Sequence, residues 1–323
     1  MDHPPKILVI GACGQIGTEL TLALRQKYGG ESVVAADLKR ESDLLKGGGP
    51  FLPLDIMDRK ILQVQVKRHG INTIYLLAAM LSASGEQQPE LAWKLNMESL
   101  FNTLEVAREE KIQKVFWPSS IAVFGPDAPK TDCPQNARST PATVYGISKL
   151  SGEQWCHYYF KRYGVDVRSI RYPGLISYKT LPGGGTTDYA IEIFHAAIRG
   201  ESYSCFLQDD TRLPMMYMDD AVRGTLELME APASSLTVRT AYNLAGISFT
   251  PAEIAAEIKS LIQNFSIEYH PDYRQAIAES WPESVNDQIA RRDWNWKPEY
   301  DLKRMAEEMI RNIRPELAIP TRH

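Results

Sequence analysis

The segment Gly11-Ala12-Cys13-Gly14-Gln15-Ile16-Gly17 restricts the fold of this chain more than any other feature. It follows the apolar run Ile7–Ile10 and precedes an amphipathic stretch from Gln15 to about Tyr28. Glycines at these positions allow a tight turn, let backbone amides approach a phosphate, and let the helix pack closely on the strand. The first turn of the helix also attracts phosphate groups. We therefore expect a strand–turn–helix unit that binds a dinucleotide through Gly11, Gly14, Gln15, Ile16 and Gly17.

The acidic residue Asp37 supports the same interpretation. It ends the second apolar run, 20 residues after Gly17, where an acid commonly accepts hydrogen bonds from a ribose diol. A carboxylate at this place repels a 2′-phosphate, so Asp37 favours NAD over NADP. Lys39 and Arg40 follow directly and would favour a phosphate, but we interpret them as part of a solvated loop.

Short apolar runs alternate with amphipathic stretches over the first 180 residues. The runs lack polar alternation, which is typical of strands covered on both faces. Strands that alternate with helices predict right-handed βαβ units, an α/β fold and a doubly wound parallel sheet of the Rossmann type. The expected strands are 7–10, 33–37, 51–54, 73–77, 115–117 and 167–171, and the expected helices are 15–28, 58–69, 90–110 and 144–163.

The rhythm changes after Pro173. We expect loops over 178–188, 200–215 and 264–284, which are rich in Gly, Pro and Asp, and helices over 189–199, 219–230, 251–263 and 301–313. The predicted organisation is a dinucleotide-binding domain over 1–177 and a smaller, mixed substrate lobe over 178–323. Some segments of the second part are expected to return to the sheet.

Composition and charge exclude several classes of protein. The chain has 323 residues and a formal net charge of −4, so a basic nucleic-acid binder is disfavoured and nothing attracts the chain to an anionic membrane. The longest apolar runs are strand-sized, and no secretory signal is apparent, so we expect a cytoplasmic protein. The four cysteines show no metal spacing, and we assign no metal site; they are Cys13, Cys133, Cys156 and Cys205.

Tyr145 and Lys149 form a Tyr-x-x-x-Lys motif inside the helix predicted over 144–163. The spacing of four places both side chains on one face of that helix. A phenol has an ordinary pKa of about 10, and a nearby ammonium group favours the phenolate. Tyr145 is therefore a candidate proton acceptor, and Lys149 can also hold the ribose of the cofactor.

The Gly-x-x-Gly-x-x-Gly spacing and the Tyr-x-x-x-Lys motif resemble the extended short-chain dehydrogenase/reductase superfamily. The resemblance includes Ser119-Ser120, for which it implies that Ser120 donates a hydrogen bond to the reacting oxygen and that Ser119 serves the backbone or the cofactor ribose. It assigns Asp55 and Ile56 to the adenine, Leu77, Ala78 and Ala79 to the nicotinamide ribose, Asn96 to a structural position, and Tyr172 and Pro173 to the nicotinamide.

Within this superfamily the chain looks like the short-chain-type L-threonine 3-dehydrogenases. The specific matches are the segment from Trp117 to Gly125 and the segment Gly184-Gly185-Thr186-Thr187-Asp188-Tyr189-Ala190. The resemblance implies NAD-dependent oxidation of L-threonine at C3, with Tyr145 as general base. Free amides and two hydroxyls at the start of the helix predicted after 188 would suit a carboxylate. The expected substrate contacts are Ser82, Ser120, Tyr145, Thr186, Thr187 and Trp281.

Two other functions remain open at this stage. A nucleotide-sugar epimerase or dehydratase of the same superfamily would need basic residues in the second lobe, where Arg212 and Arg223 are available. A non-catalytic NAD-sensing protein would lack a catalytic residue, but Ser120, Tyr145 and Lys149 are all present. The resemblance further implies a homodimer that pairs the helices 90–110 and 144–163.

Overall fold

The computed structural model describes residues 5–180 and 182–313, and its centre is a parallel sheet of six strands. The strands lie in the order β3-β2-β1-β4-β5-β7, so the chain reverses its direction of growth between β1 and β4. This arrangement confirms the predicted doubly wound α/β fold. The strands are β1 (Ile7–Ile10), β2 (Val33–Asp37), β3 (Phe51–Pro53), β4 (Thr73–Leu76), β5 (Lys114–Phe116) and β7 (Val167–Arg168).

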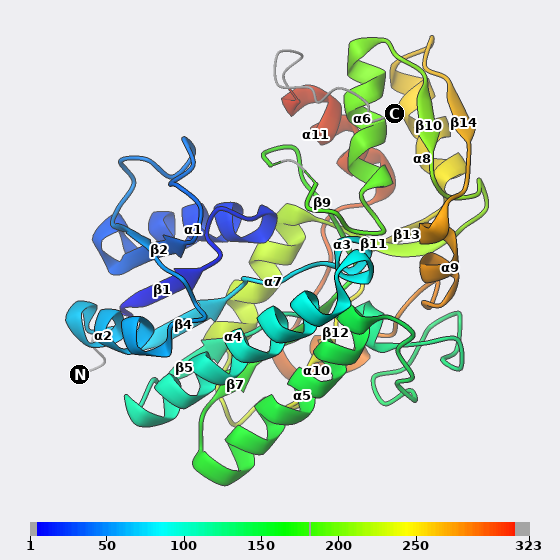
Figure 1. The fold of residues 1–323 in the computed structure, drawn as a ribbon. Coiled ribbons are helices and arrows are strands. Elements are labelled where there is room, and N and C mark those ends of the chain that lie inside the picture. The colour runs from blue at the N-terminus through cyan, green and yellow to red at the C-terminus, as the bar shows by residue number, and fades with distance from the viewer. Residues whose placement is uncertain (1–4, 181, 314–323) are drawn as a thin grey trace.

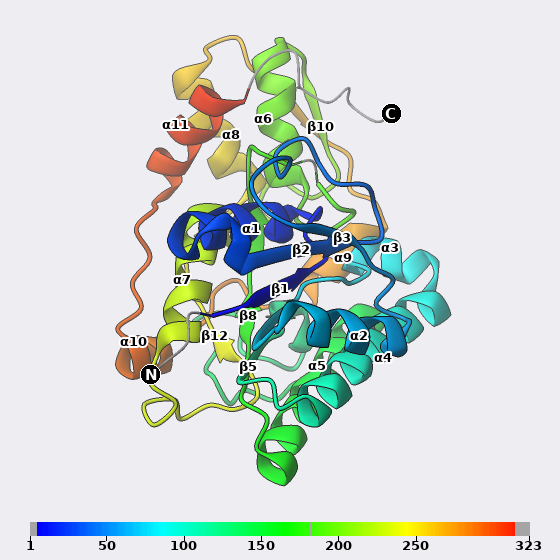
Figure 2. The same cartoon turned by 90° about the vertical axis from the view of Figure 1, so that its left-hand side faces the viewer.

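Alternate side chains of β1 enter two different cores, which is why the whole strand is apolar. Ile7 and Val9 pack with the helices α1 (Gln15–Tyr28) and α7 (Met218–Glu230). Leu8 and Ile10 pack with α2 (Arg59–His69), α4 (Pro89–Glu109) and α5 (Val144–Tyr163). Figures 1 and 2 show these two groups of helices on opposite faces of the sheet.

The helix that carries the Tyr-x-x-x-Lys motif has clear sequence signals at both ends. The Thr143 hydroxyl accepts a hydrogen bond from the amide of Gly146 at 3.0 Å and caps the first turn. Gly164 ends the helix in the left-handed conformation with φ of 72°. Helix α5 also packs extensively against α4, so the motif lies on a rigid element.

Short strands, all but β6 from the second half of the chain, form three small sheets. β11 (Leu213–Tyr217) pairs in parallel with β9 (Gly174–Ile176) and antiparallel with β13 (Ile247–Phe249). β10 (Tyr203–Cys205) pairs with β14 (Ile267–Tyr269). β8 (Ile170–Tyr172) lies between β6 (Ser119–Ser120) and β12 (Tyr242–Asn243).

Several sequence-based expectations for this half are wrong. The predicted loops 200–215 and 264–284 contain β10, most of β11, β14 and the helix α9 (Tyr273–Glu279). The predicted strand 167–171 is divided into β7 and β8, which pair with different neighbours. These elements are two to seven residues long, too short for a periodic pattern, and their pairing partners are distant in the sequence.

After β9 the chain passes more than once between the central six-stranded sheet and the region that contains the small sheets. α7 packs on α1 beside the sheet, whereas α6 (Tyr189–Arg199), α8 (Pro251–Leu261) and α11 (Leu302–Asn312) contact one another at the upper end in Figures 1 and 2. The remaining helices are α3 (Ser82–Gln87), next to α4 and α5, and α10 (Gln288–Trp294), next to β12.

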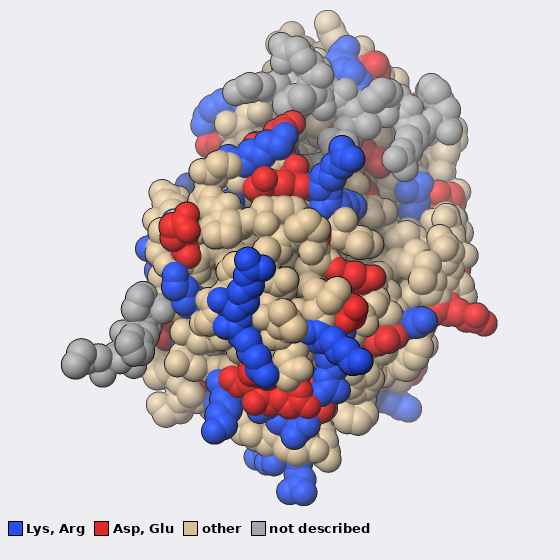
Figure 3. All heavy atoms as spheres, turned by 60° about the vertical axis from the view of Figure 1, so that its left-hand side comes forward, with Lys and Arg blue, Asp and Glu red and all other residues tan. Residues whose placement is uncertain are grey.

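Charged side chains of both signs share the surface. On the face shown in Figure 3, Lys and Arg are interspersed with Asp and Glu. Many are paired, as Arg223 is with Asp220 and Glu227. No helix of the described part is both long and apolar enough to cross a membrane, and no three His, Cys, Asp or Glu residues of residues 5–180 and 182–313 could together hold a metal ion.

Candidate active site

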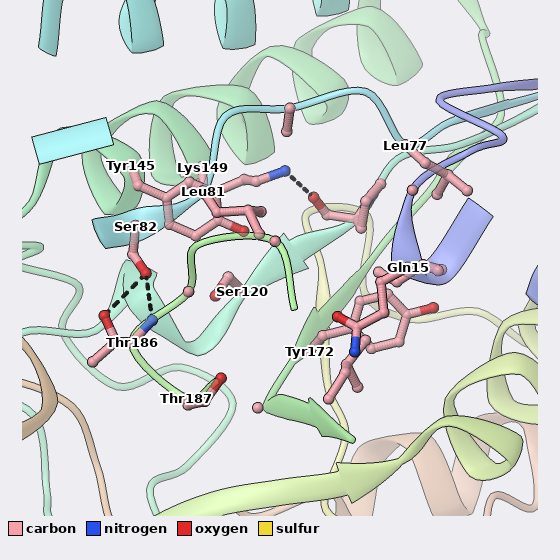
Figure 4. A pocket seen from close by; sticks show the side chains of 18 of the residues that line it. Gln15, Leu77, Leu81, Ser82, Ser120, Tyr145, Lys149, Tyr172, Thr186 and Thr187 are labelled. Carbon is pink, nitrogen blue, oxygen red and sulfur yellow. Dashed lines mark hydrogen bonds between the residues drawn. The ribbon is translucent and has the colours of Figure 1, made fainter. Parts of the chain in front are cut away.

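A cavity opens at the carboxyl ends of β1, β4 and β5, where the sheet reverses its order. Parallel α/β sheets bind their ligands at this place. Figure 4 shows Gln15, Leu77 and Tyr172 toward one end of the cavity and Tyr145, Ser82, Thr186 and Thr187 toward the other. The predicted site residues that line it are Gly11, Gly14, Gln15, Ile16, Gly17, Leu77, Ala79, Ser82, Ser120, Tyr145, Lys149, Tyr172, Pro173, Thr186, Thr187 and Trp281.

The glycine turn has the geometry that a dinucleotide needs. Gly11 has φ of 84°, and a Cβ there would lie 2.6 Å from the amide nitrogen of Ala78. A Cβ on Gly17 would lie 2.0 Å from the Gly11 carbonyl oxygen, so only glycine lets α1 approach β1 this closely. No side chain caps α1, and the Nε2 donor of Gln15 is buried without a partner. The turn therefore fits a pyrophosphate at the start of α1.

Asp37 stands at the end of β2, beside the glycine turn. Its Oδ2 accepts a hydrogen bond from the Cys13 amide at 2.8 Å, and its Oδ1 accepts one from the Lys39 amide at 2.9 Å. Both contacts fix the direction of the carboxylate, although Asp37 itself does not line the cavity, whereas Lys39 does. This arrangement is compatible with a carboxylate that meets a ribose diol.

Four other predicted cofactor residues also lie outside the cavity lining. Asp55 accepts a hydrogen bond from the Met57 amide at 2.9 Å, and Ile56 next to it is buried. Asn96 accepts from the Met80 amide at 2.8 Å and donates to the Met80 carbonyl, so it holds the segment after β4 in place. Ala78, in that same segment, contributes backbone contact with Gly11.

Tyr145 and Lys149 lie one turn apart on α5, with Ser120 facing them from β6 (Figure 4). The Lys149 ammonium donates to the Pro118 carbonyl at 2.6 Å, which fixes its long side chain. Burial lowers the pKa of Lys149 to about 7, against the opposing effect of Cys156 and Glu153. Burial raises the pKa of Tyr145 to about 12, although hydrogen bonding with the Ser120 hydroxyl opposes this.

These pKa shifts differ from the sequence-based expectation. A nearby ammonium group was expected to lower the pKa of the phenol. In the protein without ligands, however, desolvation dominates both groups, because taking a charge out of water costs more than a partner several ångströms away returns. The expectation of a lowered pKa for the Tyr145 phenol is therefore wrong for the protein without ligands.

Ser119 has a different partner from the one the resemblance suggested. Its hydroxyl donates to Glu153 Oε1 at 2.6 Å, and Glu153 is fully buried one turn after Lys149 on α5. Arg171 of β8 binds the same carboxylate through two nitrogens, at 2.8 and 2.7 Å. Ser119 therefore joins β6 to α5, and the buried ion pair joins both to β8.

The end of the cavity that lies away from the glycine turn is built from α3 and the segment 183–188. The hydroxyls of Ser82 and Thr186 are 3.1 Å apart, and the Thr186 amide donates to the Ser82 hydroxyl at 3.3 Å (Figure 4). Thr187 also lines the cavity, and Trp281 forms part of its wall.

The amides of this segment are less available than the sequence suggested. Helix α6 begins at Tyr189, so Thr186 and Thr187 precede it instead of forming its first turn. The amides of Gly184 and Gly185 donate to Asp188 Oδ2 at 2.9 and 2.8 Å. The expectation of free amides is therefore wrong for these two glycines, because Asp188 already occupies them.

Asp188 is the main residue that the sequence analysis missed. It is the sole acidic side chain in the cavity lining of the described part. Burial raises its pKa to about 6, and the hydrogen bonds from the Gly185 and Gly184 amides oppose this rise. The signal was available, because Asp directly before a predicted helix and after a glycine run commonly binds nearby backbone amides.

The fold and the cavity define a dinucleotide-binding protein of the Tyr–Lys oxidoreductase type. The chain belongs to the NAD dependent epimerase/dehydratase family, whose model matches residues 7–245. Within that family it resembles the GalE-like L-threonine 3-dehydrogenases.

Three similar proteins show how close the resemblance is. A relative from Staphylococcus haemolyticus (strain JCSC1435), an uncharacterized epimerase/dehydratase, is 46% identical over 310 residues, 95% of this chain and 97% of the relative. The holo form of a GalE-like L-threonine dehydrogenase from Cupriavidus necator is 56% identical with a TM-score of 0.94, over 96% of this chain and 100% of that one. A monomeric L-threonine 3-dehydrogenase from a metagenome database, in its apo form, is 50% identical with a TM-score of 0.92, over 97% of this chain and 100% of that one.

Proposed function

We propose that this protein oxidises L-threonine at C3 with NAD, which gives 2-amino-3-oxobutyrate, NADH and a proton. One observation carries the proposal: a single cavity contains a glycine turn for a dinucleotide, the Tyr145–Lys149–Ser120 group, and a polar end with a carboxylate. Such a cavity suits a small substrate with a hydroxyl group and two opposite charges.

The residues that would hold NAD follow from the cavity. The glycine turn and the first turn of α1 would bind the pyrophosphate, Asp37 the adenine ribose, and Tyr172 and Pro173 the nicotinamide. When bound, NAD supplies a hydride acceptor whose ring carries a positive charge. Lys149, held by Pro118, would face its ribose.

The proton from the threonine hydroxyl would be handled by the chain itself. Tyr145, as phenolate, would accept this proton while the Ser120 hydroxyl holds the same oxygen atom. The charge of Lys149 favours the phenolate, and the attraction between the two groups becomes stronger once a ligand excludes water. The Ser82–Thr186 pair would hold the substrate on the opposite side.

The polar end of the cavity would recognise the amino acid. The carboxylate of the amino acid would accept hydrogen bonds from the hydroxyl of Thr187 and from the Ser82–Thr186 pair. All three side chains line the cavity. Asp188 would accept the ammonium group, because its Oδ2 is fixed by two glycine amides and the side chain faces the cavity. Charge-assisted hydrogen bonds of this kind contribute about 1.5–3 kcal/mol each.

The substrate is tested by supplying the protein with NAD and, separately, threonine, serine, 3-hydroxybutyrate and UDP-galactose, and following the absorbance of NADH. We expect turnover with threonine that exceeds turnover with 3-hydroxybutyrate, which lacks the ammonium group. Epimerisation of UDP-galactose without NADH release would instead support a nucleotide-sugar enzyme.

The carboxylate contacts are tested by Thr187→Val and Thr186→Val, singly and together. Valine keeps the branching and volume of threonine but lacks the hydroxyl. Loss of one charge-assisted bond should raise the KM for threonine about tenfold while NAD binding changes little. Threonine amide, which lacks the carboxylate, should lose less in the same variants.

We also propose that two copies associate through α4 and α5. Their outer faces expose large apolar side chains, among them Trp93, Ile147, Trp155 and Tyr158. Sedimentation equilibrium should give a dimer, and Trp155→Lys should shift it toward monomer. A monomeric wild type would contradict the pairing, and the metagenomic relative described as monomeric makes this measurement informative.

A further inference from the structure

Glu19 is a buried carboxylate on α1, the helix that begins at the glycine turn. It is 5% exposed and lies four residues, about one turn, after Gln15. Its partners do not belong to α1. The Ser177 hydroxyl donates to its Oε1, and the Lys179 ammonium donates to its Oε2 at 2.8 Å.

Both partners lie at the start of the segment that builds the substrate end of the cavity. Ser177 directly follows β9, and its hydroxyl also accepts a hydrogen bond from the Lys179 amide at 3.1 Å. Ser177 and Lys179 thus bring the chain that leaves β9 against α1 before it reaches α6. The segment therefore contacts the cofactor-binding helix at its beginning.

The same segment is held at its other end by α3. Thr186 bonds to Ser82, and the Ser84 amide donates to the Gly184 carbonyl at 3.3 Å. Only the four positions 180–183 separate these two attachments, and Pro182 among them restricts the backbone, so a displacement at 177–179 is passed on along the chain. The position of Thr186–Asp188 consequently depends on the contacts at 177–179 as well as on α3.

The charges of Glu19 and Lys179 make the first attachment stronger than an ordinary surface contact. The Glu19 side chain is almost inaccessible, whereas that of Lys179 is partly exposed. Burial alone would lower the pKa of Lys179, but the hydrogen bond to Glu19 and the negative charge of that carboxylate, with smaller effects of Tyr178 and Asp219, together raise it. Burying a charged group is costly unless it is paired and hydrogen-bonded, so Glu19 and its two donors hold one another in place.

We propose that Glu19 is a positioning residue for the amino-acid end of the cavity: it ties the segment 177–179 to the cofactor helix and so places Thr186, Thr187 and Asp188. This inference rests on the proposed function. Glu19 touches neither substrate nor cofactor. Its effect is on the fraction of molecules in which the segment is correctly placed, and the apparent affinity for substrate falls in proportion to that fraction.

The test compares Glu19→Gln with Gln26→Ala, a change at an exposed position of the same helix. Loss of the charge-assisted contact should raise the KM for threonine about tenfold. The Kd for NAD, measured by fluorescence titration, and kcat at saturating threonine should change less than twofold. Gln26→Ala should leave all three values unchanged.

A second pair of variants separates positioning from simple support of the fold. Lys179→Met should raise the KM for threonine as Glu19→Gln does, and Lys179→Arg, which retains the charge, should restore it to near the wild-type value. Trypsin should also cleave Glu19→Gln faster than the wild type after Lys179, which is measured by mass spectrometry of the fragments.

Two results would overturn the proposal. One is an unchanged KM for threonine in both Glu19→Gln and Lys179→Met. The other is a parallel increase in the KM for threonine and the Kd for NAD, which would mean that Glu19 only supports α1. If the wild type does not oxidise threonine, the proposed function fails instead, and the cleavage rate and NAD titration still report on the Glu19 contacts.

Discussion

The buried ion pair between Glu153 and Arg171 offers a quantitative test of how the catalytic elements are held together. Glu153 belongs to α5, which carries Tyr145 and Lys149, and Arg171 belongs to β8. The Glu153 carboxylate accepts three hydrogen bonds of 2.6–2.8 Å, two from Arg171 and one from Ser119. Glu153→Gln keeps the volume of the side chain but removes its charge.

The expected loss is large because neither charge can reach water. The Glu153 side chain is fully inaccessible, and that of Arg171 is 7% exposed. Removing one partner of a buried pair usually costs about 3–5 kcal/mol, because the other charge remains buried and unpaired. A glutamine would also place an NH₂ donor against the guanidinium donors. We therefore expect the free energy of unfolding to fall by about 3 kcal/mol or more, a large part of the ~5–15 kcal/mol of an ordinary protein.

The chain provides a matched control in the pair Arg212–Glu253, whose side chains are 35% and 45% exposed. Glu253→Gln removes the same charge from an exposed pair, and glutamine can still complete the capping box at Thr250. Urea unfolding should show a change of about 0–1 kcal/mol for this variant.

The two variants together decide whether burial is the cause. If Glu153→Gln loses no more stability than Glu253→Gln, the reasoning about the buried pair is refuted. If Glu153→Gln loses stability as expected, turnover measured well below its unfolding midpoint should also fall, because the glutamine NH₂ group opposes the Arg171 guanidinium and weakens the contact of α5 with β8, which pairs with β6 at Ser120. A double variant, Glu153→Gln with Arg171→Met, should lose less than the sum of the single changes.

Four further outcomes are expected. Asp37→Ala should raise the KM for NAD and reduce the difference between the KM values for NAD and NADP. A wild type that prefers NADP would contradict the role of Asp37 in choosing NAD. Tyr145→Phe should lower turnover by about 10²–10⁴-fold, and wild-type kcat/KM for threonine should rise with pH until the phenol in the NAD complex has lost its proton. Asp188→Asn should raise the KM for threonine; in the wild type this KM should rise as the pH falls below about 6, where the carboxyl group gains a proton, and a pH-independent KM would contradict the assignment. Burial lowers the pKa of His195 to about 4, so the unfolded chain binds its proton first as the pH falls, and stability should decrease between about pH 6.5 and 4; urea unfolding of His195→Met should show a smaller decrease.

The sequence predicted the central sheet well because burial leaves a local mark on it. Each strand that is covered on both faces must be apolar throughout, as Ile7–Ile10 is, and each covering helix must show one apolar face. The short strands β10 and β14 carry no such mark. They are three residues long, and Tyr203 pairs with Ile267 from a distant part of the chain, so only the folded structure reveals them.

The same distinction applies to the candidate site. Residue types and spacing identified the glycine turn, the Tyr145–Lys149 pair and the two threonines as places for chemistry. They could not show which polar groups are already engaged by distant partners. Thr186 is bound to Ser82 from 104 positions away, and Ser119 to Glu153 from 34 positions away. Hydrogen-bond partners of this kind are set by the tertiary fold.

The charges of the cavity support the proposal that it takes a small zwitterion and a cationic cofactor. Without ligands, Lys149 and Asp188 are both displaced toward their neutral forms, with pKa values of about 7 and 6, because each is buried without a full counter-charge. A bound ammonium group would favour the charged form of Asp188. The positive ring of NAD would favour the phenolate form of Tyr145. The ammonium group would thus be a counter-charge for Asp188 and the positive ring one for the Tyr145 phenolate, whereas neither is a counter-charge for Lys149. It follows that a substrate analogue lacking the ammonium group should bind best where Asp188 is already neutral, below about pH 6, the reverse of the dependence expected for threonine.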